Sequence, residues 1–148
     1  MKRMLNLLVL LSLLAPMVLA TGCGASSAQG ASEHNMKLAD VSMLPQEMQS
    51  APTTVRESYQ FAVANPDALK NVPCYCGCGA LGHTSNYSCY VKQVDEKGTV
   101  VYDQHALGCS LCVDITQEVM KISAQGKSPG EVRQQVVAQF SQFGPPNQ

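Results

Sequence analysis

Cysteine and histidine residues crowd into one short part of the chain. Residues 74 to 112 hold six thiols and two imidazoles, and the rest of the 148-residue sequence adds only Cys23 and His34. Thiolates and imidazoles suit Zn²⁺, Cu(I) and iron–sulfur clusters, and thiols also form and exchange disulfide bonds. This crowding therefore indicates a soft-metal or thiol site. Its candidate donors are Cys74, Cys76, Cys78, His83, Cys89, His105, Cys109 and Cys112.

The first donors form a tight run in which Cys74, Cys76 and Cys78 occupy alternate positions. In an extended or turning backbone, alternate side chains face the same way. Gly77 and Gly79 allow that backbone to fold closely over whatever the sulfurs hold. His83 follows in a loop, where a ligand role and an ordinary surface role are both open.

The last three donors, His105, Cys109 and Cys112, are spaced by four and then three residues. In a continuous helix they would share one face and direct three donors toward one place. Gly108 leaves another possibility, a helix that begins only after it. Asp103 could orient the His105 ring through a hydrogen bond, or simply end a strand.

Three interpretations of these donors remain open. Eight donors match two four-coordinate ions, or a small Cu(I)–thiolate cluster that uses fewer, and metal binding would help to order the domain. Cys109 and Cys112 form a C-x-x-C near a helix N-terminus, where the pKa of a thiol falls and the thiolate can exchange disulfides. Six cysteines are also an even number, as expected for three structural bridges.

The N-terminal residues have the pattern of an export signal. Lys2-Arg3 precedes an apolar run over residues 5–19 that is short for a spanning helix. Gly22-Cys23 after this run resembles the cleavage site of bacterial lipoproteins, which implies lipidation of Cys23, for example with palmitate. The mature protein is then expected outside the cytoplasm, lipid-anchored to the bacterial cell membrane, where disulfides can form. The leader lacks the twin-Arg pattern of folded cofactor proteins, which disfavours an iron–sulfur cluster.

The chain after the leader has the length of one small domain. A net charge of −1, with no basic cluster beyond Lys2-Arg3, argues against a nucleic-acid partner. A run rich in Gly, Ala, Ser and Gln follows Cys23 and is typical of a flexible tether. The predicted organisation is a signal peptide over 1–22, a tether over 23–42 and a Cys-rich domain over 43–146.

Three helices are expected to position the donors. The first covers residues 54–64, with a capping box at Thr54–Glu57. The second begins between residues 104 and 110 and ends near Ala124, and the third follows a capping box at Ser128–Glu131. The apolar positions of the last two helices are Ile115, Val119, Ile122, Val132, Val136, Phe140 and Phe143.

Residues 90–103 predict a β-hairpin. Two β-branched or aromatic runs flank a turn that contains Gly98. The hairpin would fold the chain back and bring His105 near Cys89. The predicted fold is therefore mainly α, a small three-helix domain with a short β-hairpin and a Cys-rich loop.

The motif Val72–Cys78, followed by His83, Cys89, His105 and the Cys109–Cys112 pair, resembles a family of bacterial lipoproteins named for its PCYCGC motif. The resemblance covers roughly residues 43–143. The family has no settled biochemical function, so the resemblance implies the class of protein and not a mechanism.

A looser similarity is to the cytochrome c maturation thiol proteins. It rests on the C-x-x-C, on the turn over 125–132 and on Phe143-Gly144. This similarity implies a three-helix thiol oxidoreductase outside the cytoplasm. The C-x-x-C and the turn lie closer together here than in those proteins, which also lack the three-thiol run.

The favoured hypothesis is a membrane-anchored protein that binds Cu(I) or Zn through these donors, for holding or delivery rather than catalysis. Its expected partners are the membrane, through Cys23, and a metal-accepting or thiol partner protein. The alternatives are a thiol–disulfide oxidoreductase that uses Cys109 and Cys112, and a disulfide-stabilised interaction domain without metal. The metal hypothesis requires the Cys74–Cys78 run and the C-x-x-C to meet in one pocket.

Overall fold

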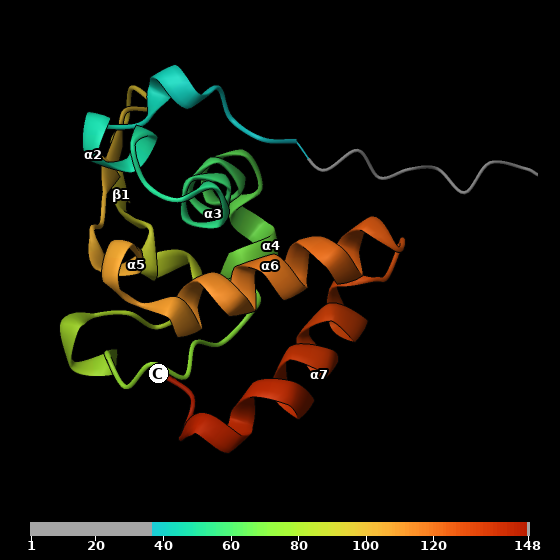
Figure 1. The fold of residues 1–148 in the computed structure, drawn as a ribbon. Helices are drawn as coiled ribbons and strands as arrows, with labels where there is room; N and C mark the ends of the chain where they lie inside the picture. The colour runs from blue at the N-terminus through green and yellow to red at the C-terminus, as the bar shows by residue number, and fades with distance from the viewer. Residues whose placement is uncertain (1–36, 148) are drawn as a thin grey trace, which may run out of the picture.

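The computed structural model describes residues 37–147. The predicted signal peptide, Cys23, His34 and most of the predicted tether lie outside these residues. The described part forms six α-helices, a two-stranded antiparallel sheet and four short 3-10 turns (Figure 1). The helices are α2 (Gln46–Gln49), α3 (Thr53–Ala64), α4 (Pro66–Lys70), α5 (His105–Gly108), α6 (Ser110–Ala124) and α7 (Pro129–Phe140), the strands are β1 (Val91–Val94) and β2 (Val100–Tyr102), and the 3-10 turns are Val41–Met43, Gly79–Leu81, Tyr87–Cys89 and Ser141–Phe143.

The mainly helical fold with one short hairpin is confirmed. The three longest helices, α3, α6 and α7, are the three that the sequence predicts, and α2, α4 and α5 are short additions of four or five residues. Helix α6 packs against α3 on one side and α7 on the other (Figure 1). None of the helices in residues 37–147 has the length and apolarity that crossing a membrane requires.

The structure confirms the predicted C-terminal end of helix α3 but not its predicted N-terminal cap. The predicted capping box at Thr54–Glu57 is wrong, because the helix begins at Thr53 after Pro52 and no side chain caps it. Its C-terminal end is as expected. The Asn65 amide donates to the Phe61 carbonyl, and Pro66 then starts α4.

The segment before α2 is hydrogen-bonded to α3. The Gln60 side-chain amide donates to the Ala39 backbone carbonyl at 2.7 Å. The Ala39 backbone amide donates to the Gln60 backbone carbonyl at 3.1 Å. The Asn65 side chain donates to the Lys37 carbonyl at 2.7 Å. Residues 37–42, which the sequence assigns to the tether, therefore dock on the helical domain.

The hairpin forms where it is predicted. Asp95 closes its turn by accepting hydrogen bonds at Oδ1 from the amides of Lys97 and Thr99, at 2.9 and 2.7 Å. At the base of the hairpin the Asp103 amide donates to the Tyr90 carbonyl at 2.8 Å. The hairpin thus returns the chain to Tyr90 just before α5 begins.

Helices α6 and α7 bury the apolar positions that their periodicity predicts, with one exception. Ile115, Val119 and Ile122 of α6 and Val132, Val136 and Phe140 of α7 are buried. Phe143, predicted to continue the α7 stripe, is 59% exposed, because the helix ends at Phe140 and a 3-10 turn follows. Gly126, at φ +75°, ends α6, and the predicted capping box of Ser128 and Glu131 starts α7.

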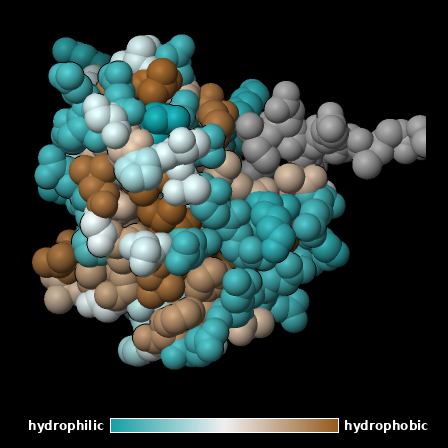
Figure 2. Space-filling model, viewed as in Figure 1, coloured by the Kyte–Doolittle hydropathy of each residue, from teal (hydrophilic) through white to brown (hydrophobic). Residues whose placement is uncertain are grey.

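The apolar core includes residues of α3, α6, α7 and the start of the hairpin, with further residues from α2 and α4. Tyr59 and Tyr90 are fully buried there, and their rings meet edge to face with centroids 5.0 Å apart. On the surface, hydrophilic residues cover much of the side of α7 (Figure 2). Apolar residues gather at the lower left of that view, where Figure 1 places the loop that carries the first thiols.

Candidate metal centre

Three cysteine sulfurs from distant parts of the chain meet in the core. Cys74 follows α4, Cys89 ends the Tyr87–Cys89 turn, and Cys112 lies in the first turn of α6. All three are fully buried, and the Cys74 Sγ lies 3.5 Å from the Cys112 Sγ and 3.7 Å from the Cys89 Sγ. Four sulfurs bound to one zinc ion at about 2.3 Å would lie roughly 3.8 Å apart. With Cys76 these residues form the first donor set, here named the buried set, whose sulfurs lie within 4.8 Å of one another.

A second donor set forms at the junction of α5 and α6. It contains Cys76, His105, Cys109 and Cys112, again within 4.8 Å of one another, and is here named the middle set. Of the two possibilities that the sequence leaves open, the structure has the helix that begins after Gly108, because Cys109 is extended (φ −115°, ψ 95°) and separates α5 from α6. The three donors still converge, since Cys109 sits at the N-cap of α6 and its Sγ lies 3.1 Å from the Cys112 Sγ.

A third donor set contains both histidines of the region. Cys76, Cys78, His83 and His105 place their donor atoms within 4.8 Å of one another, and we name them the histidine set. The Cys78 Sγ lies 3.2 Å from the His105 Nε2. The two imidazole rings meet edge to face, with centroids 4.8 Å apart.

His83 has the surroundings of a metal-binding histidine. Its Nε2 lies 3.4 Å from the Asp103 Oδ2, and its side chain is only 5% exposed. Its Nδ1 is buried and has no hydrogen-bond partner among residues 37–147. A carboxylate on one ring nitrogen and a free second nitrogen is the usual arrangement around a ligating histidine.

Asp103 holds both histidines. Its Oδ1 accepts a hydrogen bond from the backbone amide of His105 at 2.7 Å, and its Oδ2 faces the ring of His83. Of the two roles that the sequence leaves open for Asp103, the structure has a hydrogen bond to His105, made by the His105 backbone amide. The Lys92 ammonium lies 3.9 Å from the same carboxylate.

A buried hydrogen-bond network fixes the position of Cys112. Its carbonyl accepts from the Asn86 side chain at 3.1 Å and from the Tyr90 hydroxyl at 2.9 Å. Thr116 donates to the Asn86 Oδ1 at 2.6 Å, and the Asn86 amide donates to the Val72 carbonyl at 2.9 Å. The network therefore ties the loop before Cys74, the segment before Cys89 and α6 together. Sequence reasoning missed Asn86 and Thr116, since nothing local marks a buried polar pair.

The last described residue closes over the first thiols. Asn147 is buried, its backbone amide donates to the Cys74 carbonyl at 2.7 Å, and its Nδ2 lies 3.3 Å from the Cys76 Sγ. Figure 1 shows the C-terminal end beside the loop that follows α4. No pattern in the sequence predicts this contact, so sequence reasoning also missed it.

The closeness of the sulfurs changes their acidity. Hydrogen bonds from Cys112 and Cys89 hold the pKa of the Cys74 thiol well below its ordinary value. The hydrogen bond to Cys74 raises the pKa of Cys112. The buried sulfurs thus favour one thiolate shared among neighbouring thiols, and a thiolate is the form that binds metal.

The six cysteines of the described region are free thiols, the closest pair being Cys109 and Cys112. A disulfide bond needs sulfurs about 2.05 Å apart. Cys74 contacts both Cys89 and Cys112, so no unique pairing of bridges stands out. All eight predicted donors nevertheless lie in one cluster, in which Cys76 links the Cys74–Cys78 run to the C-x-x-C. His105 and Cys89 belong to that cluster but not to the same donor set.

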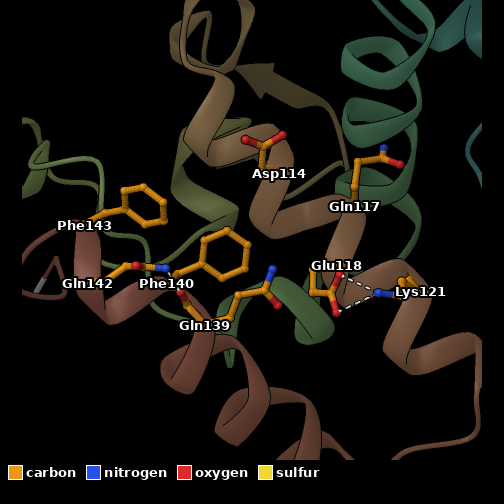
Figure 3. Close-up of a pocket in the computed structure, with 8 residues that line it drawn as sticks. All are labelled: Asp114, Gln117, Glu118, Lys121, Gln139, Phe140, Gln142 and Phe143. Carbon is orange, nitrogen blue, oxygen red and sulfur yellow. Dashed lines mark hydrogen bonds and ion pairs between the residues drawn. The ribbon is translucent and has the colours of Figure 1, made fainter.

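One surface hollow lies away from the thiol cluster. It is formed by α6, α7 and the turn after α7, and Figure 3 shows its largely polar lining, with a Lys121–Glu118 ion pair at 3.2 Å and Phe140 and Phe143 at one end. Its lining includes no cysteine or histidine. Three thiols of the cluster, Cys74, Cys89 and Cys112, are instead packed inside the domain, which suits a bare ion better than an organic ligand. Cys109 is half-buried and lines a separate surface hollow beside the start of α3.

Comparison with known proteins identifies a family and little else. No curated protein and no solved structure matches the chain, and nothing supports the similarity to the cytochrome c maturation thiol proteins. Residues 10–148 match a family described as "Protein of unknown function with PCYCGC motif". The match covers nearly the whole sequence and includes the motif that carries three of the clustered thiols. The chain belongs to the PCYCGC-motif family.

Proposed function

We propose that this protein binds a soft metal ion, Cu(I) or Zn, through its clustered cysteines and histidines, and holds it or delivers it to a partner. The observation that carries the proposal is the convergence of eight soft donors from four segments into overlapping sets of four. Thiolate and imidazole are the donors that these ions prefer. We include in this proposal a partner protein that accepts the metal or reacts through its own thiols.

Two further features favour a metal over plain packing. The 3.5 and 3.7 Å separations around Cys74 are close to the sulfur–sulfur edge of a tetrahedral site, about 3.8 Å. The buried Nδ1 of His83 lacks a hydrogen bond within the described region, and such a group is costly unless something binds it. A bound ion would satisfy that nitrogen while Asp103 holds the opposite one.

The proposal includes export and lipidation at Cys23. Its support is the leader pattern, together with a family match that begins at residue 10 and so includes Cys23. Cells grown with labelled palmitate should incorporate the label into the full chain, and Cys23→Ser should abolish incorporation. Equal labelling of both chains would contradict the anchor without bearing on the metal.

Metal content of the purified chain tests the central claim. The full chain, purified in detergent under anaerobic and reducing conditions, is expected to retain copper or zinc by elemental analysis. The double variant Cys74→Ser/Cys112→Ser should lose a large part of it, because both residues belong to the buried set. Cys23→Ser removes a cysteine outside the cluster and should keep the metal content of the wild type. Equal metal content in all three proteins would refute the proposal.

Asp103→Asn is expected to weaken binding by about 10- to 100-fold, the usual effect of losing a carboxylate that orients a ligating histidine. Asparagine keeps the shape of Asp103 but offers a weaker acceptor to the His83 ring and the His105 amide. Competition with a coloured zinc chelator measures the affinity. Glu96→Gln, the same chemical change at an exposed position of the hairpin turn, serves as the control. Equal affinities of the two variants would show that Asp103 does not support the site.

A second candidate function is thiol–disulfide exchange by Cys109 and Cys112. The observation that favours it is their sulfur separation of 3.1 Å, with the half-buried Cys109 at the N-cap of α6. On this alternative the reduced chain carries no metal, and a thiol-alkylating reagent labels Cys109 faster than the other cysteines. Slow, equal labelling of all six clustered cysteines would remove the alternative.

A further inference from the structure

The three donor sets overlap in an ordered way. Cys76 belongs to all three, Cys112 belongs to the buried and middle sets, and His105 belongs to the middle and histidine sets. Three separate four-coordinate ions would need twelve donors, whereas the cluster holds eight. The sets therefore cannot all be filled at once by donors that each bind a single ion.

Two of the sets can be filled together. The buried set and the histidine set share Cys76 alone, so they use seven different donors. A thiolate sulfur has several lone pairs and can bind two ions, whereas an imidazole nitrogen has one lone pair and can bind only one. The one donor that the two sets share, Cys76, is a cysteine, and its thiolate can bind both ions.

We propose that the cluster holds two soft metal ions bridged by the Cys76 thiolate, and that Cys109 is the ligand through which ions move between the two positions. This inference rests on the proposed function. The inner ion binds Cys74, Cys76, Cys89 and Cys112, and the outer ion binds Cys76, Cys78, His83 and His105.

Cys109 is the donor that the two-ion arrangement leaves over. Cys109 belongs only to the middle set. That set shares Cys112 with the buried set, His105 with the histidine set, and Cys76 with both. The middle set therefore lies between the two ion positions. Cys109 is half-buried at the N-cap of α6, with its Sγ 3.1 Å from the Cys112 Sγ. It can bind an ion passing in either direction.

The two ion positions differ in how deeply their ligands are buried. Three of the four residues of the buried set are fully buried, whereas Cys76, Cys78 and His105 in the histidine set are partly exposed. An ion would enter at the histidine set.

The ion passes to the middle set as its bonds to Cys78 and His83 break and bonds to Cys109 and Cys112 form. It then passes to the buried set as its bonds to His105 and Cys109 break and bonds to Cys74 and Cys89 form. Each thiol gives its proton to solvent as it binds the ion, and each released thiolate takes one back. No electron is transferred, so the oxidation state of the ion is unchanged.

Asn147 supports the bridging residue. Its Nδ2 lies 3.3 Å from the Cys76 Sγ, and its backbone amide binds the Cys74 carbonyl. A sulfur bound to two ions still has a lone pair that can accept this hydrogen bond. The C-terminal residues thereby position Cys76 between the two sets without contributing a ligand.

Cadmium NMR tests the bridge directly. Cd²⁺ of an NMR-active isotope, added alone to the reduced full chain, stands in for a four-coordinate soft ion. We expect two resonances, one typical of four sulfurs and one of mixed sulfur and nitrogen, each split by the other through the shared sulfur. Native mass spectrometry should count two ions. In Cys76→Ser the splitting should disappear. Two unsplit wild-type resonances, or a single bound ion, would overturn the inference.

A second variant keeps the test decisive if Cys76→Ser fails to fold. Cys109→Ser should retain both resonances and their splitting, since Cys109 binds neither ion at rest. It should release the inner ion to a competing chelator several-fold more slowly than the wild type. Unchanged release would overturn the role of Cys109. A wild-type chain that binds no cadmium would overturn the proposed function itself, whereas one ion or two uncoupled ions would overturn only the bridge.

Discussion

Removing metal from the loaded protein is expected to lower its unfolding temperature by roughly 15 °C. Free metal at about a thousand times its dissociation constant stabilises a folded site by about 4 kcal/mol. In a domain of this size, each 1 kcal/mol moves the unfolding midpoint by roughly 4 °C. The donors come from segments on both sides of the hairpin, so only the folded chain offers them together. Thermal unfolding of the reduced full chain, followed by circular dichroism with zinc and with a chelator, measures the shift.

The double variant Cys74→Ser/Cys112→Ser supplies the control for this experiment. It lacks two members of the buried set but keeps the histidine set, so its midpoint should respond to zinc or chelator clearly less than that of the wild type. A wild-type midpoint that is insensitive to chelator but rises on oxidation would instead favour structural disulfides. The experiment thus separates two of the interpretations that the cysteine count leaves open.

Tyr90→Ala is expected to lower the free energy of unfolding of the metal-free protein by about 3–5 kcal/mol, as for other large aromatic residues removed from a core. The Tyr90 side chain is fully buried and packs edge to face on Tyr59. Its hydroxyl also binds the carbonyl of Cys112, so the variant leaves a cavity directly beneath the buried set. Urea unfolding followed by circular dichroism measures the loss.

Tyr90→Phe separates the hydroxyl from the ring. It keeps the packing but removes a buried donor to Cys112, and should cost about 1–2 kcal/mol. Tyr102→Phe is the matched control, since the Tyr102 hydroxyl also donates to a backbone carbonyl, that of Met43 at 3.0 Å, but Tyr102 is only half-buried. If both Phe variants lose the same free energy of unfolding, the buried network around Cys112 contributes no more stability than the half-buried hydrogen bond of Tyr102.

Local patterns in the sequence predicted several elements correctly. The hairpin follows from two β-rich runs around Gly98, and the start of α7 from the Ser128–Glu131 capping box. The buried stripe of α6 follows from helical periodicity. Each of these features depends on residues within one or two turns of each other. Short-range hydrogen bonds and side-chain periodicity therefore suffice to specify them.

Predictions failed or stayed open where the local pattern allows more than one outcome. The capping box at Thr54–Glu57 did not form, because the helix begins one residue earlier, directly after Pro52. The sequence left open whether one helix joins His105 to Cys112, and the extended Cys109 separates α5 from α6. Phe143 left the α7 stripe because the following residues lead to Asn147, which binds beside Cys74 and Cys76.

The residue types alone specify the chemistry of the site, because the identity of a donor is a property of the residue: residues 74–112 hold eight sulfur and nitrogen donors. The grouping of these donors follows from the folded domain. The division into buried, middle and histidine sets, the place of Cys76 in all three and the support from Asp103 and Asn147 depend on contacts between distant segments, such as the hydrogen bond that joins Asn147 to Cys74. Such contacts arise from packing the whole domain, and no local periodicity encodes them.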